Sequence, residues 1–215
     1  MNWIHHQLTE NRNFYRARIA KGFYICLLVF LALCAGCYFT LRAMPDQAQK
    51  IFDAFSELLK QKGLVDSNGA VTASSILGNN AGSAAAGMAL GLLPFAFLPL
   101  ISLLANSLVI GGVLAVMSMK GISAWRLVVF GLLPHGIFEI PAIILAISAG
   151  LWLCLNMCRL ALRRPSAMPL EEALPCLLRL YLLTVLPLLI VAAAVEGYIT
   201  PRLLAMFLSS GGTIV

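Results

Sequence analysis

The chain has 215 residues, of which 60% are hydrophobic and only 11% are charged. A soluble domain carries roughly twice that charged fraction, so the composition excludes an ordinary soluble protein. The formal net charge of +6 does not indicate nucleic acid, because Lys and Arg gather at the ends of apolar runs, where they orient membrane helices. We therefore expect an integral membrane protein that contacts the lipid bilayer and no nucleic acid.

Four long stretches of the chain hold almost no formal charge. They are 22–41 and 67–119, without any charge, 127–158, with Glu139 alone, and 180–201, with Glu196 alone. A bilayer core about 30 Å thick needs roughly 20 apolar residues per helix, so the second stretch has room for two spans. Continuous apolar runs favour helices over the alternating strands of a membrane barrel. The predicted fold is an all-α, polytopic transmembrane helix bundle of about five spans, forming a single membrane domain over residues 1–215.

Residues 1–21 form a polar leader that we expect on the cytoplasmic side of the plasma membrane. The leader contains four basic side chains against Glu10 alone: Arg12, Arg16, Arg18 and Lys21. Such a surplus of positive charge stays in the cytoplasm. A first span over 22–41 then leads outside, and five spans place the C-terminus outside as well.

The segment 42–75 is predicted to be an outside loop that contains one amphipathic, extracytoplasmic helix over 45–63. Pro45 suits the start of this helix and Gly63 its end. Apolar residues recur in it at helical spacing and charged residues take the other faces. The apolar set is Ile51, Phe52, Phe55, Leu58 and Leu59, and the charged set is Lys50, Asp53, Glu57 and Lys60. We expect the helix to lie on the membrane surface or to cap the bundle.

The second and third spans are predicted over 76–93 and 100–118. The second span is rich in small residues and contains a GxxxG sequence from Gly87 to Gly91. Small residues let helices approach closely in lipid. We therefore expect a close helix contact here, either within the chain or in a homo-oligomer such as a homodimer.

The last two spans are predicted to enclose a cytoplasmic connection over 165–175. The stretch 127–158 contains Pro134 and Pro141, and it is either one bent helix or two broken ones. The fifth span is expected over 177–194.

Six polar side chains fall at membrane depth and form the candidate site. They are His135, Glu139, Glu196, Asn79, Asn80 and Asn106. An ionisable group within a bilayer is costly unless it is paired or faces a cavity, which makes it a functional candidate. His135 and Glu139 are four residues apart, so they share one face of a helix.

Three interpretations of this intramembrane polar cluster compete. The favoured one is a hydrogen-bonded cluster that fixes the bundle, and the second is an ion or proton path. A metal or catalytic centre comes third, because no HExxH sequence is present and one His with two separated Glu is a weak signal. The chain contains no enzyme motif, so we expect no catalytic residue, no metal site and no cofactor.

The sequence around His135 resembles a known family. Residues 133–142 read LPHGIFEIPA, which is similar to the LPHGxFExPA signature of the stage II sporulation protein M family. The matching positions in this motif are Pro134, His135, Gly136, Glu139 and Pro141. Two shorter matches are the Asn79-Asn80 pair and the stretch from Glu196 to Thr200 and Pro201. The resemblance covers about residues 20–205, mostly as a hydropathy pattern.

The resemblance implies a plasma-membrane protein with about five spans and no known catalytic activity. The family's sporulation member works with peptidoglycan-degrading partners during engulfment. Nothing in the chain indicates a sporulating host, so we carry over only the membrane scaffold. We therefore expect an integral membrane scaffold or assembly factor with protein partners at the cell envelope. The alternative is a small transporter or channel component with a path lined by His135, Glu139 and Glu196, and an intramembrane enzyme comes third.

Overall fold

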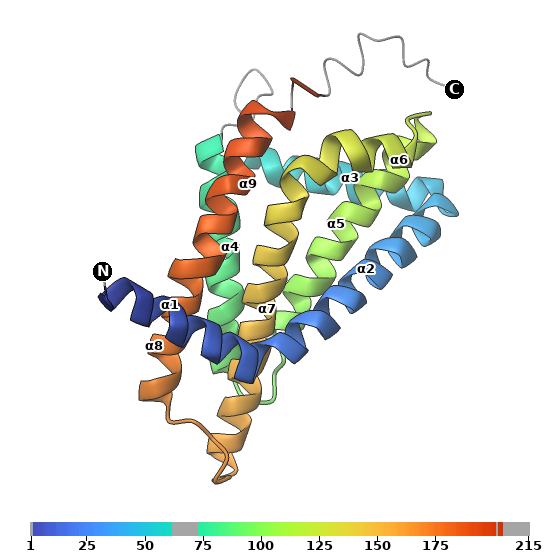
Figure 1. Cartoon of the computed structure of the whole chain (residues 1–215). Coiled ribbons are helices and arrows are strands. Elements are labelled where there is room, and N and C mark those ends of the chain that lie inside the picture. Colours follow the sequence, from blue (N-terminus) through green and yellow to red (C-terminus); the bar gives the residue numbers. More distant parts are fainter. Residues whose placement is uncertain (1, 62–72, 201, 204–215) are drawn as a thin grey trace. The chain divides into compact units, whose positions relative to one another are not determined.

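The computed structural model describes residues 2–61, 73–200 and 202–203, and every regular element in these ranges is helical (Figure 1). Within this part of the chain, four helices are long and apolar enough to cross a membrane. These helices are Trp3–Arg42, Pro99–Met119, Ala124–Ala161 and Leu170–Tyr198. The prediction of an all-α, polytopic membrane protein is confirmed.

The second predicted span is shorter than the other helices. It corresponds to α4, Ala73–Ala89, a helix of 17 residues that continues as a single 3₁₀ turn, Leu90–Leu92. That length is at the lower limit for crossing the hydrocarbon core. Two asparagines and several glycines and serines also make α4 less apolar than the long helices. The described residues therefore contain four long helices and the short α4 where about five spans were expected.

Two of the long helices are each made of α-helical pieces joined by a π-helical segment that precedes a proline. Leu127–Leu132 joins α6, Ala124–Arg126, to α7, Leu133–Ala161, and Tyr181–Val185 joins α8, Leu170–Leu180, to α9, Leu186–Tyr198. Pro134 and Pro187 each follow their π segment by two residues. A proline offers no N–H to the carbonyl four residues earlier and its ring crowds that carbonyl, so the preceding turn widens. The stretch 127–158 is therefore part of one continuous helical run and is not broken in two.

The leader is helical and runs directly into the first span. α1, Asn2–Phe14, is joined to α2, Ala20–Arg42, by the π segment Tyr15–Ile19. The basic side chains of the leader are exposed, as the positive-inside argument requires of groups that stay in water. The side of the membrane on which the leader lies stays a prediction.

The expected connection over 165–175 is wrong at its C-terminal end, because α8 already begins at Leu170. Glu171 and Glu172 occupy the first turn of α8, where negative charge is favourable at the positive end of the helix dipole. The face at Ala173, Leu177 and Leu180 is buried. These two gains outweigh the backbone hydrogen bond that Pro175 removes.

The chain divides into two compact units, each assembled from three separate segments. Unit 1 consists of Met1–Val29, Asn80–Leu103 and Ile140–Leu189, and unit 2 consists of Phe30–Asn79, Leu104–Glu139 and Ile190–Val215. The boundaries fall inside the helices, so that α2, α4, α5, α7 and α9 each contribute residues to both units. α5 is the helix Pro99–Met119. The expectation of a single membrane domain stays a prediction.

Unit 1 is built around the middle of α7, which is almost entirely buried from Ala142 to Cys154. The GxxxG segment of α4 makes its close contact here. A Cβ atom added at Gly91 would overlap the carbonyl group of Gly150, and one added at Gly150 would lie 2.5 Å from the carbonyl oxygen of Gly87. The close approach that the sequence predicts is therefore made within the chain.

The turn that links α4 to α5 is held by two cysteines of α7. Phe95 in this turn has a positive φ of 64°, which is unusual for an aromatic residue. Its backbone N–H donates to the Cys158 Sγ at 3.2 Å, and the Cys154 thiol donates to the Leu93 carbonyl at 3.4 Å. Both cysteines are unpaired with any other cysteine and act as small polar anchors inside unit 1.

Unit 2 contains the predicted amphipathic helix as α3, Pro45–Gln61. Ala48 is buried, and Ile51 and Phe52 pack against a small core made by Leu41 of α2 with Ala115 and Val116 of α5. α3 thus caps the C-terminal ends of α2 and α5, and the charged residues Lys50, Asp53 and Glu57 are exposed. The side chains of Phe55, Leu58, Leu59 and Lys60 lie outside the described residues, as does Gly63. That α3 is extracytoplasmic stays a prediction.

Candidate functional site

Three ionisable side chains of the predicted cluster meet in unit 2. His135 and Glu139 come from the first turns of α7, and Glu196 comes from the end of α9. One ligand atom from each of them lies within 4.8 Å of the other two. All three residues are half-buried, although each belongs to a helix apolar enough to cross a membrane. We call these residues the His-Glu-Glu cluster.

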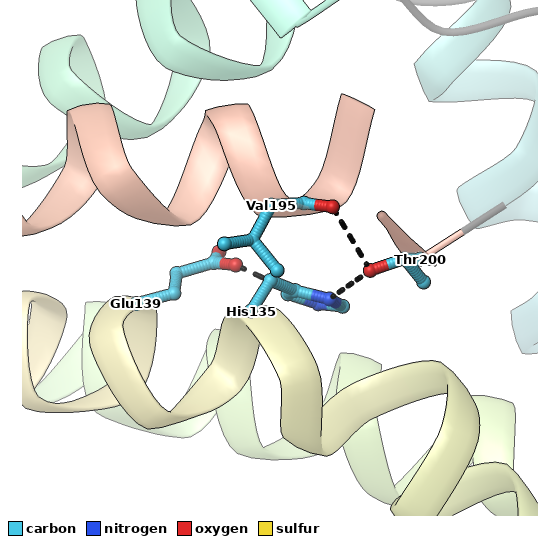
Figure 2. A network of polar contacts seen from close by, with 4 residues as sticks. All are labelled: His135, Glu139, Val195 and Thr200. Atoms are coloured by element: carbon cyan, nitrogen blue, oxygen red, sulfur yellow. Dashed lines mark hydrogen bonds and ion pairs between the residues drawn. The ribbon is translucent and has the colours of Figure 1, made fainter. Parts of the chain in front are cut away.

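His135 and Glu139 share one face of α7, as their spacing predicted. The Nε2 atom of His135 lies 3.8 Å from the Oε2 atom of Glu139, and the two side chains are 12% and 20% exposed. Figure 2 shows both side chains turned toward the helix that carries Val195. The distance is too long for a strong hydrogen bond, so the two groups face each other without closing a tight ion pair.

Thr200 fixes the orientation of the His135 ring from the other side. Its Oγ1 atom lies 3.5 Å from the Nδ1 atom of His135, and the hydroxyl donates to the Val195 carbonyl at 3.3 Å (Figure 2). A hydroxyl has one proton to donate. When that proton goes to Val195, the hydroxyl oxygen accepts from the neutral His135 tautomer that carries its proton on Nδ1. Nε2 is the nitrogen that faces Glu139.

A glycine beside Glu196 brings the end of α9 close to α4. A Cβ atom added at Gly197 would lie 2.7 Å from the Cβ atom of Ala73, the first residue of α4. Real Cβ atoms do not come this close, so only glycine permits the contact. Gly197 therefore allows the end of α9 to lie against the start of α4.

The three asparagines of the predicted cluster are not all in the same unit as the His-Glu-Glu cluster. Asn79, Asn80 and Asn106 are half-buried, and each makes an interaction. Asn79 and Asn106 belong to unit 2 with the His-Glu-Glu cluster, whereas Asn80 is counted in unit 1. Their membership in one cluster with His135 stays a prediction.

Three further motif residues belong to the helical run that carries His135 and Glu139. Gly136 is buried directly beside His135, and Pro134 and Pro141 are half-buried within the same helical run. Pro201 lies outside the described residues.

Unit 1 contains polar contacts that the sequence reasoning missed. Asn11 of α1 donates from Nδ2 to the Thr184 Oγ1 atom at 2.8 Å, and the Tyr181 hydroxyl donates to the Ala81 carbonyl at 2.9 Å. Asn156, which is 1% exposed, bonds both the N–H and the carbonyl of Met168. The predicted cluster includes three asparagines but not Asn156, although Asn156 also stands in an apolar run.

The chemistry of the cluster follows from its groups. One imidazole nitrogen and two carboxylates converge from two helices, and a buried hydroxyl orients the imidazole. Such a set can hold a proton or a cation, or it can pin α7 to α9 through hydrogen bonds.

Comparison with known proteins decides the relationship that the motif suggested. The family model described as Stage II sporulation protein M matches residues 25–201, a range that includes the whole motif and the three residues of the cluster. The chain belongs to the stage II sporulation protein M family.

A relative of this family member is an uncharacterized protein of Methanocaldococcus jannaschii. It is 30% identical over 122 residues, which cover 57% of this chain and 67% of the relative. The search of solved structures found no match.

Proposed function

We propose that this stage II sporulation protein M family member is a membrane scaffold or assembly factor. It is not an enzyme, and it organises protein partners at the cell envelope. It lies in the plasma membrane with its N-terminus in the cytoplasm and its C-terminus outside. The observation that carries the proposal is α3, a helix anchored on one face and charged on the other.

The anchoring of α3 supports a fixed docking surface. Ala48 is 1% exposed and lies in the core formed with α2 and α5. The ammonium group of Lys120 lies 5.1 Å from the centre of the Phe52 ring, a cation–π contact that adds to the attachment. On the outer face the Gln49 amide donates to Asp53 at 2.7 Å. A helix held in this way presents its charges in a defined arrangement.

An open apolar pocket lies beside that charged face. It has a volume of about 240 Å³, and α3 and α5 form its walls. Its lining residues are Ile51, Phe52, Ala54, Leu108, Val109, Gly112 and Val113. An exposed apolar pocket is typical of surfaces that bind another protein or a helix of it.

A small transporter or channel component is the second candidate. The convergence of His135, Glu139 and Glu196 in membrane helices favours it, because such groups also line ion paths. The contact of His135 with Thr200 supports the scaffold instead, because it joins α7 to the residues that follow α9.

Site-specific photo-crosslinking in living cells tests the scaffold. A photoreactive amino acid at Asp53 is expected to give a discrete adduct with an envelope protein. The same amino acid at Glu171, an exposed acidic residue of α8, is the matched control and is expected to give none. The charge reversal Glu57→Lys is expected to weaken the Asp53 adduct. Equal adducts from both positions, or none from Asp53, would contradict a docking role for α3.

A further inference from the structure

We propose that His135, Glu139 and Glu196 bind one divalent transition-metal ion of the Zn²⁺ or Mn²⁺ type. This site goes beyond the scaffold function and does not depend on it. The sequence alone argued against a metal, because one His and two distant Glu make no recognised spacing. The fold supplies what the spacing lacks, since it brings Glu196 from α9 to the His135–Glu139 pair on α7.

The geometry is close to that of a metal site. The three ligand atoms lie within 4.8 Å of one another. In a tetrahedral zinc site, bonds of about 2.0–2.2 Å put neighbouring ligand atoms roughly 3.3–3.5 Å apart. The closure needed is on the order of 1 Å, which rotation of the two long glutamate side chains provides.

The hydrogen bonds of His135 point its free nitrogen at the proposed ion. In the neutral tautomer in which Thr200 donates to Val195 and accepts from Nδ1–H, the Nε2 atom carries a lone pair on the side of Glu139. A metal-binding histidine usually gives its other N–H to an oxygen acceptor in this way, which fixes both tautomer and ring orientation. Thr200 is 6% exposed and is the positioning residue of the site.

The charges of the cluster match a divalent cation. Two ionised carboxylates and a neutral imidazole carry a formal charge of −2, and they belong to helices with the length and composition of membrane spans. Uncompensated charge is costly there, and a divalent ion brings the total to zero.

The donor set indicates which ion is bound. An imidazole nitrogen suits Zn²⁺ and other transition metals, whereas Ca²⁺ takes six to eight oxygen ligands and Mg²⁺ retains most of its water. Carboxylates suit both Zn²⁺ and Mn²⁺. Three protein ligands leave one coordination position for water.

Metal analysis of the purified full-length chain tests the site. The protein is prepared in lipid nanodiscs with an affinity tag free of histidine, loaded separately with Zn²⁺, Mn²⁺, Ca²⁺ or Mg²⁺, and dialysed. We expect one Zn²⁺ or Mn²⁺ per chain and no retained Ca²⁺ or Mg²⁺. Glu196→Gln and His135→Gln keep the side-chain size and are expected to lose the ion. The double variant His5→Gln/His6→Gln removes the two exposed histidines of α1 and is expected to retain it.

Substitution of Thr200 provides a second test, in which metal affinity is measured. A purely structural role of the cluster would not predict a change in that affinity. Thr200→Val keeps the shape but removes the acceptor of Nδ1–H, and we expect metal affinity to fall by about 10–100-fold. Thr200→Ser keeps the hydroxyl and is expected to restore it. Affinity is measured by competition with a fluorescent zinc chelator on samples that are monodisperse in size-exclusion chromatography.

Two results would overturn the metal site. One is equal Zn²⁺ retention by the wild type, Glu196→Gln and His135→Gln, which would mean adventitious binding only. The other is a folded wild type that retains no ion and whose thermal midpoint a chelator does not change, which would mean that protons occupy the cluster. Either result leaves the crosslinking from α3 untouched, so failure of the metal site and failure of the scaffold are distinguishable.

Discussion

At the scale of single residues, the cluster joins two helices through groups that hold one another in place. Thr200 is bonded both to the helix that precedes it, through Val195, and to α7, through His135. The Val195 carbonyl also accepts the N–H of Ile199 at 2.9 Å. The end of α9 is therefore closed by hydrogen bonds, which a helix end inside a membrane requires.

Substitution of Glu139 tests the cluster as a structural pin. In metal-free protein, Glu139→Gln keeps the shape and most hydrogen bonding, and we expect a loss of about 1–2 kcal/mol in the free energy of unfolding. Glu139→Leu is expected to cost more, because its polar neighbours would be left without a partner. Chemical unfolding in detergent with a chelator present measures both. A leucine variant as stable as the wild type would contradict the pin.

The sequence predicts part of this site and not the rest. The face shared by His135 and Glu139 follows from helical spacing alone. The approach of Glu196 does not, because it brings together side chains from two helices that are distant in the sequence, α7 and α9. The hydrogen-bonding role of Thr200 is also invisible in the sequence, since it depends on where α9 ends against α7.

At the scale of elements, glycines decide where helices approach closely. Gly150 of α7 faces the α4 backbone at Gly87, and a Cβ atom there would also lie 3.1 Å from the Pro99 side chain. At Gly82, one turn earlier in α4, nothing lies within 4 Å of an added Cβ atom. An added methyl group would therefore clash at Gly150 and meet open space at Gly82.

Substitution by alanine is expected to have opposite effects on stability at Gly150 and at Gly82. Gly150→Ala places a methyl group against backbone that cannot move aside, and we expect a loss of about 1–3 kcal/mol in the free energy of unfolding. Gly82→Ala meets open space, and we expect a change within about 1 kcal/mol, in the stabilising direction that helix propensity gives. Thermal unfolding of both variants in the same detergent measures the difference. Equal stability of the two would show that α4 and α7 do not pack here.

The helix boundaries could be predicted from the sequence only in part. α3 was predicted well, because its period is clear and Pro45 marks its start. The beginning of α8 does not follow from the apolar pattern, because Glu171 and Glu172 in its first turn are charged. The π segments were not predicted either, although Pro134 and Pro187 identify two of them once the carbonyl four residues earlier is considered.

At the scale of the whole molecule, the charge distribution predicts the orientation in the membrane. The basic leader favours a cytoplasmic N-terminus, which places α3 outside. A cysteine introduced by Glu57→Cys, at an exposed position of α3, is expected to react with a membrane-impermeant thiol reagent in intact cells. The unmodified chain, with its six native cysteines, sets the background. Labelling that requires lysis of the cells would reverse the orientation.

We propose that the His-Glu-Glu cluster holds α7 to α9 in a scaffold and does not conduct ions. Ion flux through proteoliposomes tests this most directly, with purified wild type and Glu139→Gln in parallel vesicles under an imposed proton or cation gradient. Both proteins are expected to leak no faster than protein-free vesicles. Sustained flux through the wild type that Glu139→Gln abolishes, with the folded state intact, would contradict it and identify a transporter.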